Sequence, residues 1–216
     1  MLQRRIATKC GFLEVPLRYL AIGDSYTAGE SLQVEDSWSM QWAHALRAKG
    51  IAIDDPGIIA KNGWTTDELC EALDEAESNN TLSPPYDLVS ISIGVNNQYS
   101  GRGEDNYREE FSALLKRAIG YAGKKTSHVF VLSIPDWGIS EFGQKSGRDT
   151  AQIARELDSY NQVNAEVSDT AGVHYIDIGK ITREVGADAK FYAEDGLHPS
   201  RALYALWVKE LLKVRM

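Results

Sequence analysis

The chain has 216 residues, 43% of them hydrophobic, which suffices for one sizeable core but not for two, so we predict a single domain over residues 1–216. Acidic residues outnumber basic ones by 31 to 23, and the formal net charge is -8. This balance excludes a surface built to neutralise the phosphates of nucleic acid or the head groups of anionic lipids.

The amino-terminal segment, residues 1–20, contains Arg4, Arg5 and Lys9 but no continuous apolar stretch long enough for a signal peptide or a membrane span. We therefore expect a cytoplasmic protein without a membrane span, although a chain that had lost an export signal would show the same pattern. The two cysteines, Cys10 and Cys70, lie far apart, and we expect both to be reduced.

Apolar runs of strand length alternate with amphipathic stretches of helical length, a pattern typical of parallel strands joined by crossover helices. We predict about five strands, at residues 18–22, 51–59 (weak), 88–93, 128–134 and 173–178. Helices are predicted from a cap at Ser37 or Asp36 to residue 49, after a capping box of Thr65 and Glu68, at 107–119, at 150–171, and after a cap at Ser200. This order predicts a three-layer α/β/α sandwich.

The first predicted strand ends at Ile22 and is followed directly by Gly23, Asp24 and Ser25. Ligands of such folds bind beyond the carboxyl ends of the strands, so Ser25 falls where we expect the active site. A helix beginning near it would direct backbone N–H groups toward a group bound to its hydroxyl. A serine that only caps this helix would give the same triplet, so the triplet alone is weak evidence.

A serine hydroxyl becomes an effective nucleophile only when a base removes its proton. Three of the four histidines, His44, His128 and His174, fall in predicted helix or strand segments, where structural roles are expected. His198 lies instead in the polar segment EDGLHPS before the last helix, and Asp195 precedes it by three residues as an acceptor for the Nδ1 proton. A turn without a catalytic role would also fit this segment.

Acyl chemistry requires hydrogen-bond donors for an oxyanion, and two further strand ends offer them. In AKNGWTTDEL the backbone N–H of Gly63 precedes a helix, and in SIGVNNQY the side-chain amide of Asn96 follows a strand. Each alone could be a turn residue. Taken together, four loops at one sheet edge each supply one part that a serine ester hydrolase needs.

These four segments resemble the SGNH hydrolases, also called the GDSL esterase and lipase family, over nearly the whole chain. The matching blocks are GDSY with Ser25, NGWTT with Gly63, GVNN with Asn96, and DGLH with Asp195 and His198. The resemblance implies a flavodoxin-like fold, a nucleophilic Ser25, and His198 as a base supported by Asp195. It also implies an oxyanion hole made of the Ser25 and Gly63 backbone N–H groups and the Asn96 side chain.

Two residues depart from the family pattern. Tyr26 replaces the leucine of the family name, where we expect it to pack beside the chemistry. Asn97 replaces the aspartate of Gly-x-Asn-Asp, which leaves open how that loop is braced.

We therefore predict two-step hydrolysis of a small-molecule ester through an acyl-enzyme, without a metal or a cofactor. An acyltransferase or thioesterase would use the same residues, and a non-catalytic carbohydrate-binding module would need only the pocket. A metal site built from Asp24, Asp195 and His198 is a further alternative, which sensitivity to chelators would reveal.

The substrate is predicted to carry a short acyl group, such as the acetyl group of an acetylated carbohydrate, because no long insertion remains to form a lid over a fatty chain. Residues 135–148, PDWGISEFGQKSGR, show no clear secondary structure and are expected to line a small pocket. The aromatic residues Tyr26, Trp64 and Tyr99 near the active loops suit stacking on a sugar or an aryl group.

Overall fold

The computed structural model describes residues 4–8 and 11–215. Its central sheet has five parallel strands in the order β4-β3-β5-β6-β7. The strands are β3 (Tyr19–Gly23), β4 (Gly57–Ala60), β5 (Leu88–Ser92), β6 (Val129–Leu132) and β7 (His174–Ile176). The second strand of the sheet lies outside the first, which is the flavodoxin-like order. The predicted α/β/α architecture is confirmed.

The middle strands of the sheet are buried on both faces. Every residue of β3, β5 and β6 is buried, as a parallel sheet covered by helices on both sides requires. The weak strand predicted within residues 51–59 is shorter, since Pro56 lacks an N–H for a ladder bond and β4 begins after it. Ile53 makes only an isolated parallel bridge with Leu17.

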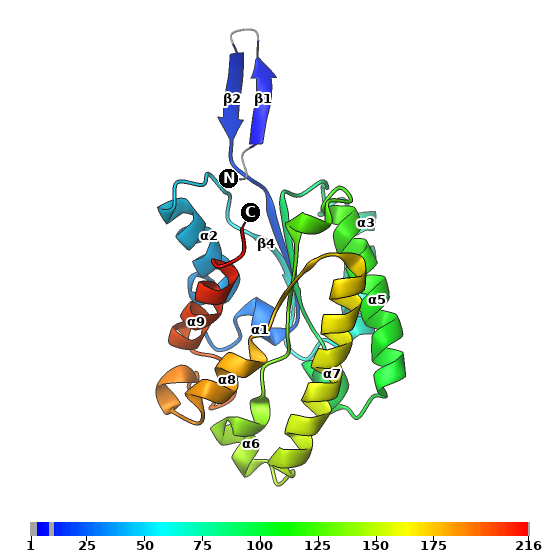
Figure 1. Cartoon of the computed structure of the whole chain (residues 1–216), viewed down its shortest axis with the longest axis vertical. Helices are drawn as coiled ribbons and strands as arrows, with labels where there is room; N and C mark the ends of the chain where they lie inside the picture. The colour runs from blue at the N-terminus through cyan, green and yellow to red at the C-terminus, as the bar shows by residue number, and fades with distance from the viewer. Residues whose placement is uncertain (1–3, 9–10, 216) are drawn as a thin grey trace.

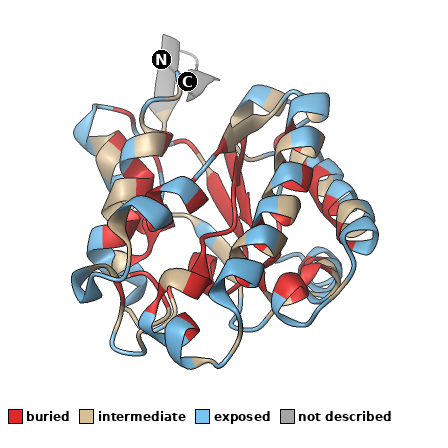
Figure 2. Ribbon diagram, turned by 60° about the horizontal axis from the view of Figure 1, so that its bottom comes forward, coloured by how far each residue is buried: buried red, intermediate tan, exposed pale blue. Residues whose placement is uncertain are grey.

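Helices cover both faces of the sheet (Figure 1). One side carries α2 (Trp38–Ala48) and α9 (Arg201–Leu211), which pack on each other, and the other side carries α3 (Thr66–Ser78), α5 (Glu104–Tyr121) and α7 (Thr150–Ala171). The buried residues lie along the strands and on the helix faces turned toward them (Figure 2). The shorter helices are α1 (Ser25–Ala28), α4 (Val95–Tyr99), α6 (Glu141–Lys145) and α8 (Gly179–Val185).

The helix caps follow the sequence pattern. The Ser37 hydroxyl caps α2, while Asp36 belongs to the preceding 3₁₀ turn, η1 (Val34–Asp36). The Glu68 carboxylate accepts the Thr65 backbone N–H at 2.9 Å, which is the reciprocal half of a capping box. Ser200 accepts backbone N–H groups at the start of α9.

Several short elements were not predicted, among them an amino-terminal hairpin and the helical turns of segment 135–148. Strands β1 (Arg4–Thr8) and β2 (Gly11–Val15) form an antiparallel hairpin that projects from the body of the molecule (Figure 1). The segment 135–148 is not irregular, because it contains a 3₁₀ turn, η3 (Trp137–Ile139), and the helix α6. These elements are short and contain no long continuous apolar run, so the sequence pattern could not reveal them.

Among the described residues Cys70 is a free thiol, while Cys10 lies outside them. No helix in the described part of the chain is both long enough and apolar enough to cross a membrane.

Candidate active site

The sheet register brings three loops to one edge. Gly23 at the end of β3 pairs with Ala60 of β4 on one side and with Ser92 of β5 on the other. The residues that follow these strands therefore leave the sheet at the same level. This edge adjoins the switch point between β3 and β5, where ligands of flavodoxin-like folds bind.

Ser25 is the first residue of α1, directly after β3. A Cβ atom at Gly23 would lie 2.2 Å from the Ser92 carbonyl oxygen and 2.3 Å from Thr27 Oγ1, so only glycine lets the strand pass this closely into the helix. Asp24 caps the helix by accepting the Tyr26 backbone N–H at 3.0 Å. Strand and cap together fix Ser25, whose side chain is 4% exposed, at the edge of the sheet.

His198 and Asp195 lie in the turn between the 3₁₀ turn η4 (Ala189–Phe191) and α9. Asp195 Oδ2 lies 2.7 Å from His198 Nδ1, and Asp195 Oδ1 accepts the backbone N–H groups of Leu197 and His198 at 2.9 Å each. The backbone bonds fix the carboxylate in the turn, and the side-chain bond fixes the imidazole. The hydrogen bonds that fix this pair thus all lie within a segment of four residues.

The protonation of this pair follows from its contacts. Burial opposes the ionisation of Asp195, but hydrogen bonds from Ser31, from His198 and from the two backbone N–H groups lower the pKa of the carboxyl to about 2. An ionised carboxylate only accepts hydrogen bonds, so Nδ1 of His198 carries the proton. Nε2 of the neutral imidazole is then the nitrogen with a free lone pair.

Ser25, Asn96 and His198 border one pocket of about 240 Å³. The structure thereby brings together the serine, the amide and the histidine that the sequence placed in three separate loops. The pocket lining comprises Ser25, Tyr26, Asn62, Val95, Asn96, Tyr99, Trp137, Phe142, Leu197 and His198.

The loop between β4 and α3 reaches the pocket through Asn62, and Gly63 follows with a φ of +86°. Asn96, at the start of α4, donates from Nδ2 to the carbonyl oxygen of Trp64 at 2.8 Å. This bond joins the two loops in which we predicted oxyanion donors. One of the two amide protons of Asn96 is used by it, and an amide nitrogen carries two.

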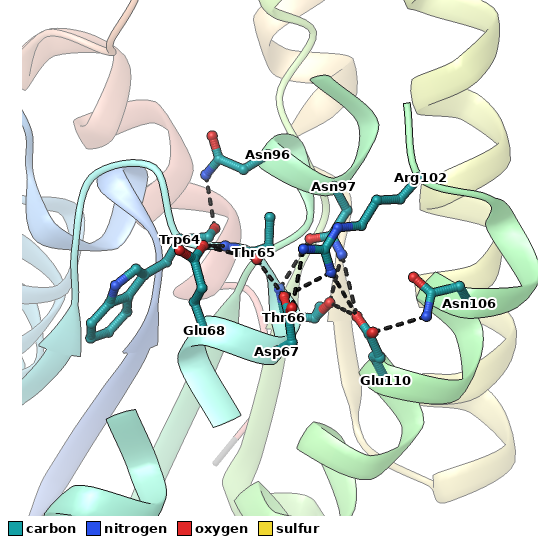
Figure 3. A network of polar contacts seen from close by, with 10 residues as sticks. All are labelled: Trp64, Thr65, Thr66, Asp67, Glu68, Asn96, Asn97, Arg102, Asn106 and Glu110. Carbon is teal, nitrogen blue, oxygen red and sulfur yellow. Dashed lines mark hydrogen bonds and ion pairs between the residues drawn. The ribbon is translucent and has the colours of Figure 1, made fainter. Parts of the chain in front are cut away.

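Asn97, which is not among the pocket-lining residues, joins these loops through Thr66 (Figure 3). It is fully buried, accepts the Thr66 backbone N–H at 3.1 Å and donates to the Thr66 hydroxyl at 2.6 Å. The asparagine at this position therefore joins α4 to the start of α3 by two hydrogen bonds. Tyr26, the other departure from the family pattern, is buried with its ring centroid 5.5 Å from that of His198.

A family model described as GDSL-like lipase/acylhydrolase matches residues 21–206. The chain belongs to the GDSL-like lipase/acylhydrolase family. As a member of this family it is a carboxylic ester hydrolase that acts on small-molecule esters. The predicted family is confirmed.

A search of curated protein sequences found no match for this GDSL hydrolase. Solved structures share its fold at low sequence identity. Axe2, an acetylxylan esterase from Geobacillus stearothermophilus, has a TM-score of 0.68 at 18% identity, over 92% of this chain and 94% of that one. Phospholipase A1 from Streptomyces albidoflavus NA297 has a TM-score of 0.68 at 18% identity, over 92% and 99%. Esterase EstA from Pseudoalteromonas sp. has a TM-score of 0.65 at 17% identity, over 91% and 94%.

The pocket wall of the GDSL hydrolase is aromatic on one side. Tyr99 and Phe142 are 49% and 38% exposed, and Trp137 packs between them with ring centroids 5.4 and 6.2 Å away. The expectation for segment 135–148 as a pocket wall agrees with Trp137 and Phe142. Trp64 is not among the lining residues, because its side chain packs against the core instead.

Some residues at this site had no signal in the sequence. Ser31 reaches Asp195 from 164 positions away, and Glu110 reaches the Thr66 hydroxyl from the middle of α5. Polar side chains on exposed loops and helices are common, so only the fold identifies these two. Among the described residues, no group of three or more His, Cys, Asp or Glu side chains is placed to hold a metal ion.

Proposed function

We propose that the enzyme hydrolyses short-chain acyl esters with Ser25 as nucleophile, His198 as base and Asp195 as the group that orients His198. The observation that carries this assignment is the shared pocket of Ser25 and His198, with Asp195 2.7 Å behind the imidazole. Ser25 lies at the strand end where the fold binds its ligands, and the imidazole turns its unprotonated nitrogen away from Asp195.

In the first half of the reaction, His198 Nε2 takes the proton of Ser25 as Oγ attacks the ester carbonyl carbon. The backbone N–H groups of Ser25 and Gly63 and the Asn96 amide stabilise the resulting oxyanion. The imidazolium then protonates the departing alkoxide as the bond between carbonyl carbon and ester oxygen breaks, leaving an acyl-enzyme. Water repeats the cycle with His198 as base and releases the carboxylic acid.

The preference for short acyl groups rests on the size and shape of the pocket. A volume of about 240 Å³ lies below the range of roughly 300–1,000 Å³ typical of sites for drug-sized ligands. Its exposed aromatic side, with Tyr99 and Phe142, offers flat apolar faces of the kind that pack on a sugar ring or an aryl group. An acetylated carbohydrate or a small aryl ester fits both features.

The test is to replace Ser25 and His198 by alanine, one at a time. Each change should lower turnover by on the order of a thousandfold or more, because the two residues act as one unit. Ser112→Ala is the matched control, since this serine is exposed on α5. A fluorophosphonate probe should label the wild type and the control but not the Ser25→Ala variant. Near wild-type turnover of a folded Ser25→Ala or His198→Ala protein would refute the assignment.

A further inference from the structure

The amide of Asn97 has only one possible orientation. Thr66 N–H, which can only donate, lies 3.1 Å from Asn97 Oδ1, so this atom must be the carbonyl oxygen. The amide nitrogen then faces Thr66 Oγ1 at 2.6 Å. Both residues are fully buried, so each of these polar groups depends on its partner in the protein.

The Thr66 hydroxyl has a single proton, and the acceptor of that proton follows from the same assignment of donors and acceptors. Thr66 Oγ1 accepts from Asn97, so its own proton goes to the next acceptor, which is Glu110 Oε2 in a short contact. The other oxygen of Glu110 accepts from Asn106 Nδ2 at 2.9 Å, and Arg102 lies 3.6 Å from Oε2. Donation therefore runs from Asn97 to the Glu110 carboxylate, both through the Thr66 hydroxyl and in a longer direct contact of 3.5 Å between Asn97 Nδ2 and Glu110 Oε2 (Figure 3).

This direction couples the residue types at positions 97 and 110. An aspartate at position 97 would present a second acceptor to the Thr66 hydroxyl, which has one proton for two carboxylates. The two carboxylates would then lie close together as like charges, and the one at position 97 would be fully buried, which is costly. An asparagine is the isosteric residue that donates to the Thr66 hydroxyl and leaves the Thr66 proton to Glu110.

The same chain of bonds connects to the pocket. Asn97 follows Asn96, whose amide holds the Trp64 carbonyl, and Trp64 lies between Gly63 and the start of α3. Glu110 itself lies on α5 and is not among the pocket-lining residues. Its contacts with Thr66 and Asn97 connect it to the two loops that carry the oxyanion donors.

We propose that Asn97 and Glu110 are a matched pair of positioning residues that, through Thr66, hold the Asn96 amide and the Gly63 loop in place for the oxyanion. This rests on the proposed function, in which Asn96 and Gly63 supply oxyanion donors. A displaced donor weakens transition-state binding more than substrate binding, so the pair should govern kcat rather than KM.

The test is a double-mutant cycle with Asn97→Asp, Glu110→Gln and the two changes combined. The Asn97→Asp change should lower kcat by about tenfold or more with KM within about twofold, since a misplaced donor affects mainly the transition state. Glu110→Gln should cost less, because its carbonyl oxygen still accepts the Thr66 proton. In the double variant the glutamine amide can donate to the new carboxylate, so most of the lost kcat should return. Glu109→Gln, an exposed neighbour on α5, is the control and should match the wild type.

Rates are expressed per active site by fluorophosphonate titration, and the melting temperature is measured for each variant. The proposal is overturned if the two single effects on kcat multiply in the double variant, or if kcat per active site stays constant while only the melting temperature falls.

If the Asn97→Asp protein does not fold alone, a folded and active double variant demonstrates the rescue. If neither folds, Glu110→Ala must lower kcat more than Glu110→Gln, and equal values contradict the pairing. Retained turnover in Ser25→Ala would refute the proposed function instead, whatever the cycle shows.

Discussion

The Ser31 hydroxyl donates a hydrogen bond of 2.6 Å to Asp195 Oδ2, the oxygen that also faces His198 Nδ1. Ser31 has a φ of +65°, in the left-handed region that a side chain normally avoids. The backbone is thus held in an unfavourable conformation where its side chain supports the carboxylate that orients the histidine. Ser31 therefore combines a hydrogen bond to Asp195 with an unfavourable backbone conformation, and mutation can separate the two effects.

Replacing Ser31 by alanine or by glycine should distinguish these two contributions. Both changes remove the hydroxyl, so both should lower kcat by roughly fivefold, because an ordinary hydrogen bond contributes about 1 kcal/mol. Glycine also relieves the left-handed conformation, so Ser31→Gly should be more stable than Ser31→Ala by about 1 kcal/mol. Initial rates and urea unfolding measure the two effects. Equal stability of the variants, or wild-type rates in both, would contradict this account.

The extent to which the sequence predicts this site depends on how far apart the partners lie. The turn of Asp195 and His198 spans four residues, so its spacing alone indicated the contact between them. Ser25 and Asn96 were predicted to lie together because the carboxyl ends of parallel strands lie at one edge of a sheet. Only the positions of the strands are needed to apply this rule. Ser31 and Glu110 obey neither rule, since each reaches its partner through tertiary packing that a single sequence does not display.

The same distinction applies to the fold. The long apolar runs of β3, β5 and β6 predicted a covered parallel sheet, and the periodic stretch 150–171 predicted α7 with both ends correct. The hairpin of β1 and β2, the turn η3 and the helix α6 were missed because they are short and lack the long continuous apolar runs that revealed the strands of the sheet.

The pH dependence of kcat/KM should have a single acidic limb. Hydrogen bonds keep the pKa of Asp195 near 2 despite its burial, so its carboxylate stays ionised over the whole assay range. The general base of the proposed mechanism is the His198 imidazole, which accepts the Ser25 proton only in its neutral form. The rate should rise about tenfold per pH unit below the midpoint and level off above it. Assays with p-nitrophenyl acetate between mildly acidic and mildly alkaline pH test this, and a flat profile argues against a histidine base.

Asp24 should make the stability of the fold depend on pH. Burial raises the pKa of its carboxyl to about 7, although backbone N–H groups of Tyr26 and Gly94 act in the opposite direction. In the unfolded chain an aspartate ionises near roughly 3.9. Between these two values the unfolded chain releases a proton that the folded chain keeps, so the folded state loses relative stability as the pH rises from about 4 to about 7.

The Asp24→Asn variant cannot titrate, so the comparison isolates this group. The melting temperature of Asp24→Asn minus that of the wild type should be more positive at pH 8 than at pH 5. Asp169→Asn, at an exposed position of α7, controls for the loss of one charge and should show no such trend. If the melting temperatures of the wild type and of Asp24→Asn differ by the same amount at both pH values, Asp24 is ionised throughout.

The last prediction concerns acyl-chain length and follows from the pocket walls. A pocket of about 240 Å³ bordered by Tyr99 and Phe142 holds only a few methylene groups, so a longer acyl chain meets these walls and must bend out of the pocket at a steric cost, without the roughly 0.8 kcal/mol that each methylene gains on burial. Acetate and butyrate esters of p-nitrophenol should therefore have kcat/KM values about tenfold or more above those of laurate and palmitate. Phe142→Ala should narrow this ratio by enlarging the pocket. Val34→Ala, which shortens an exposed apolar side chain that is not among the pocket-lining residues, should leave it unchanged. A preference for laurate in the wild type would show that the acyl chain binds along a surface other than this pocket.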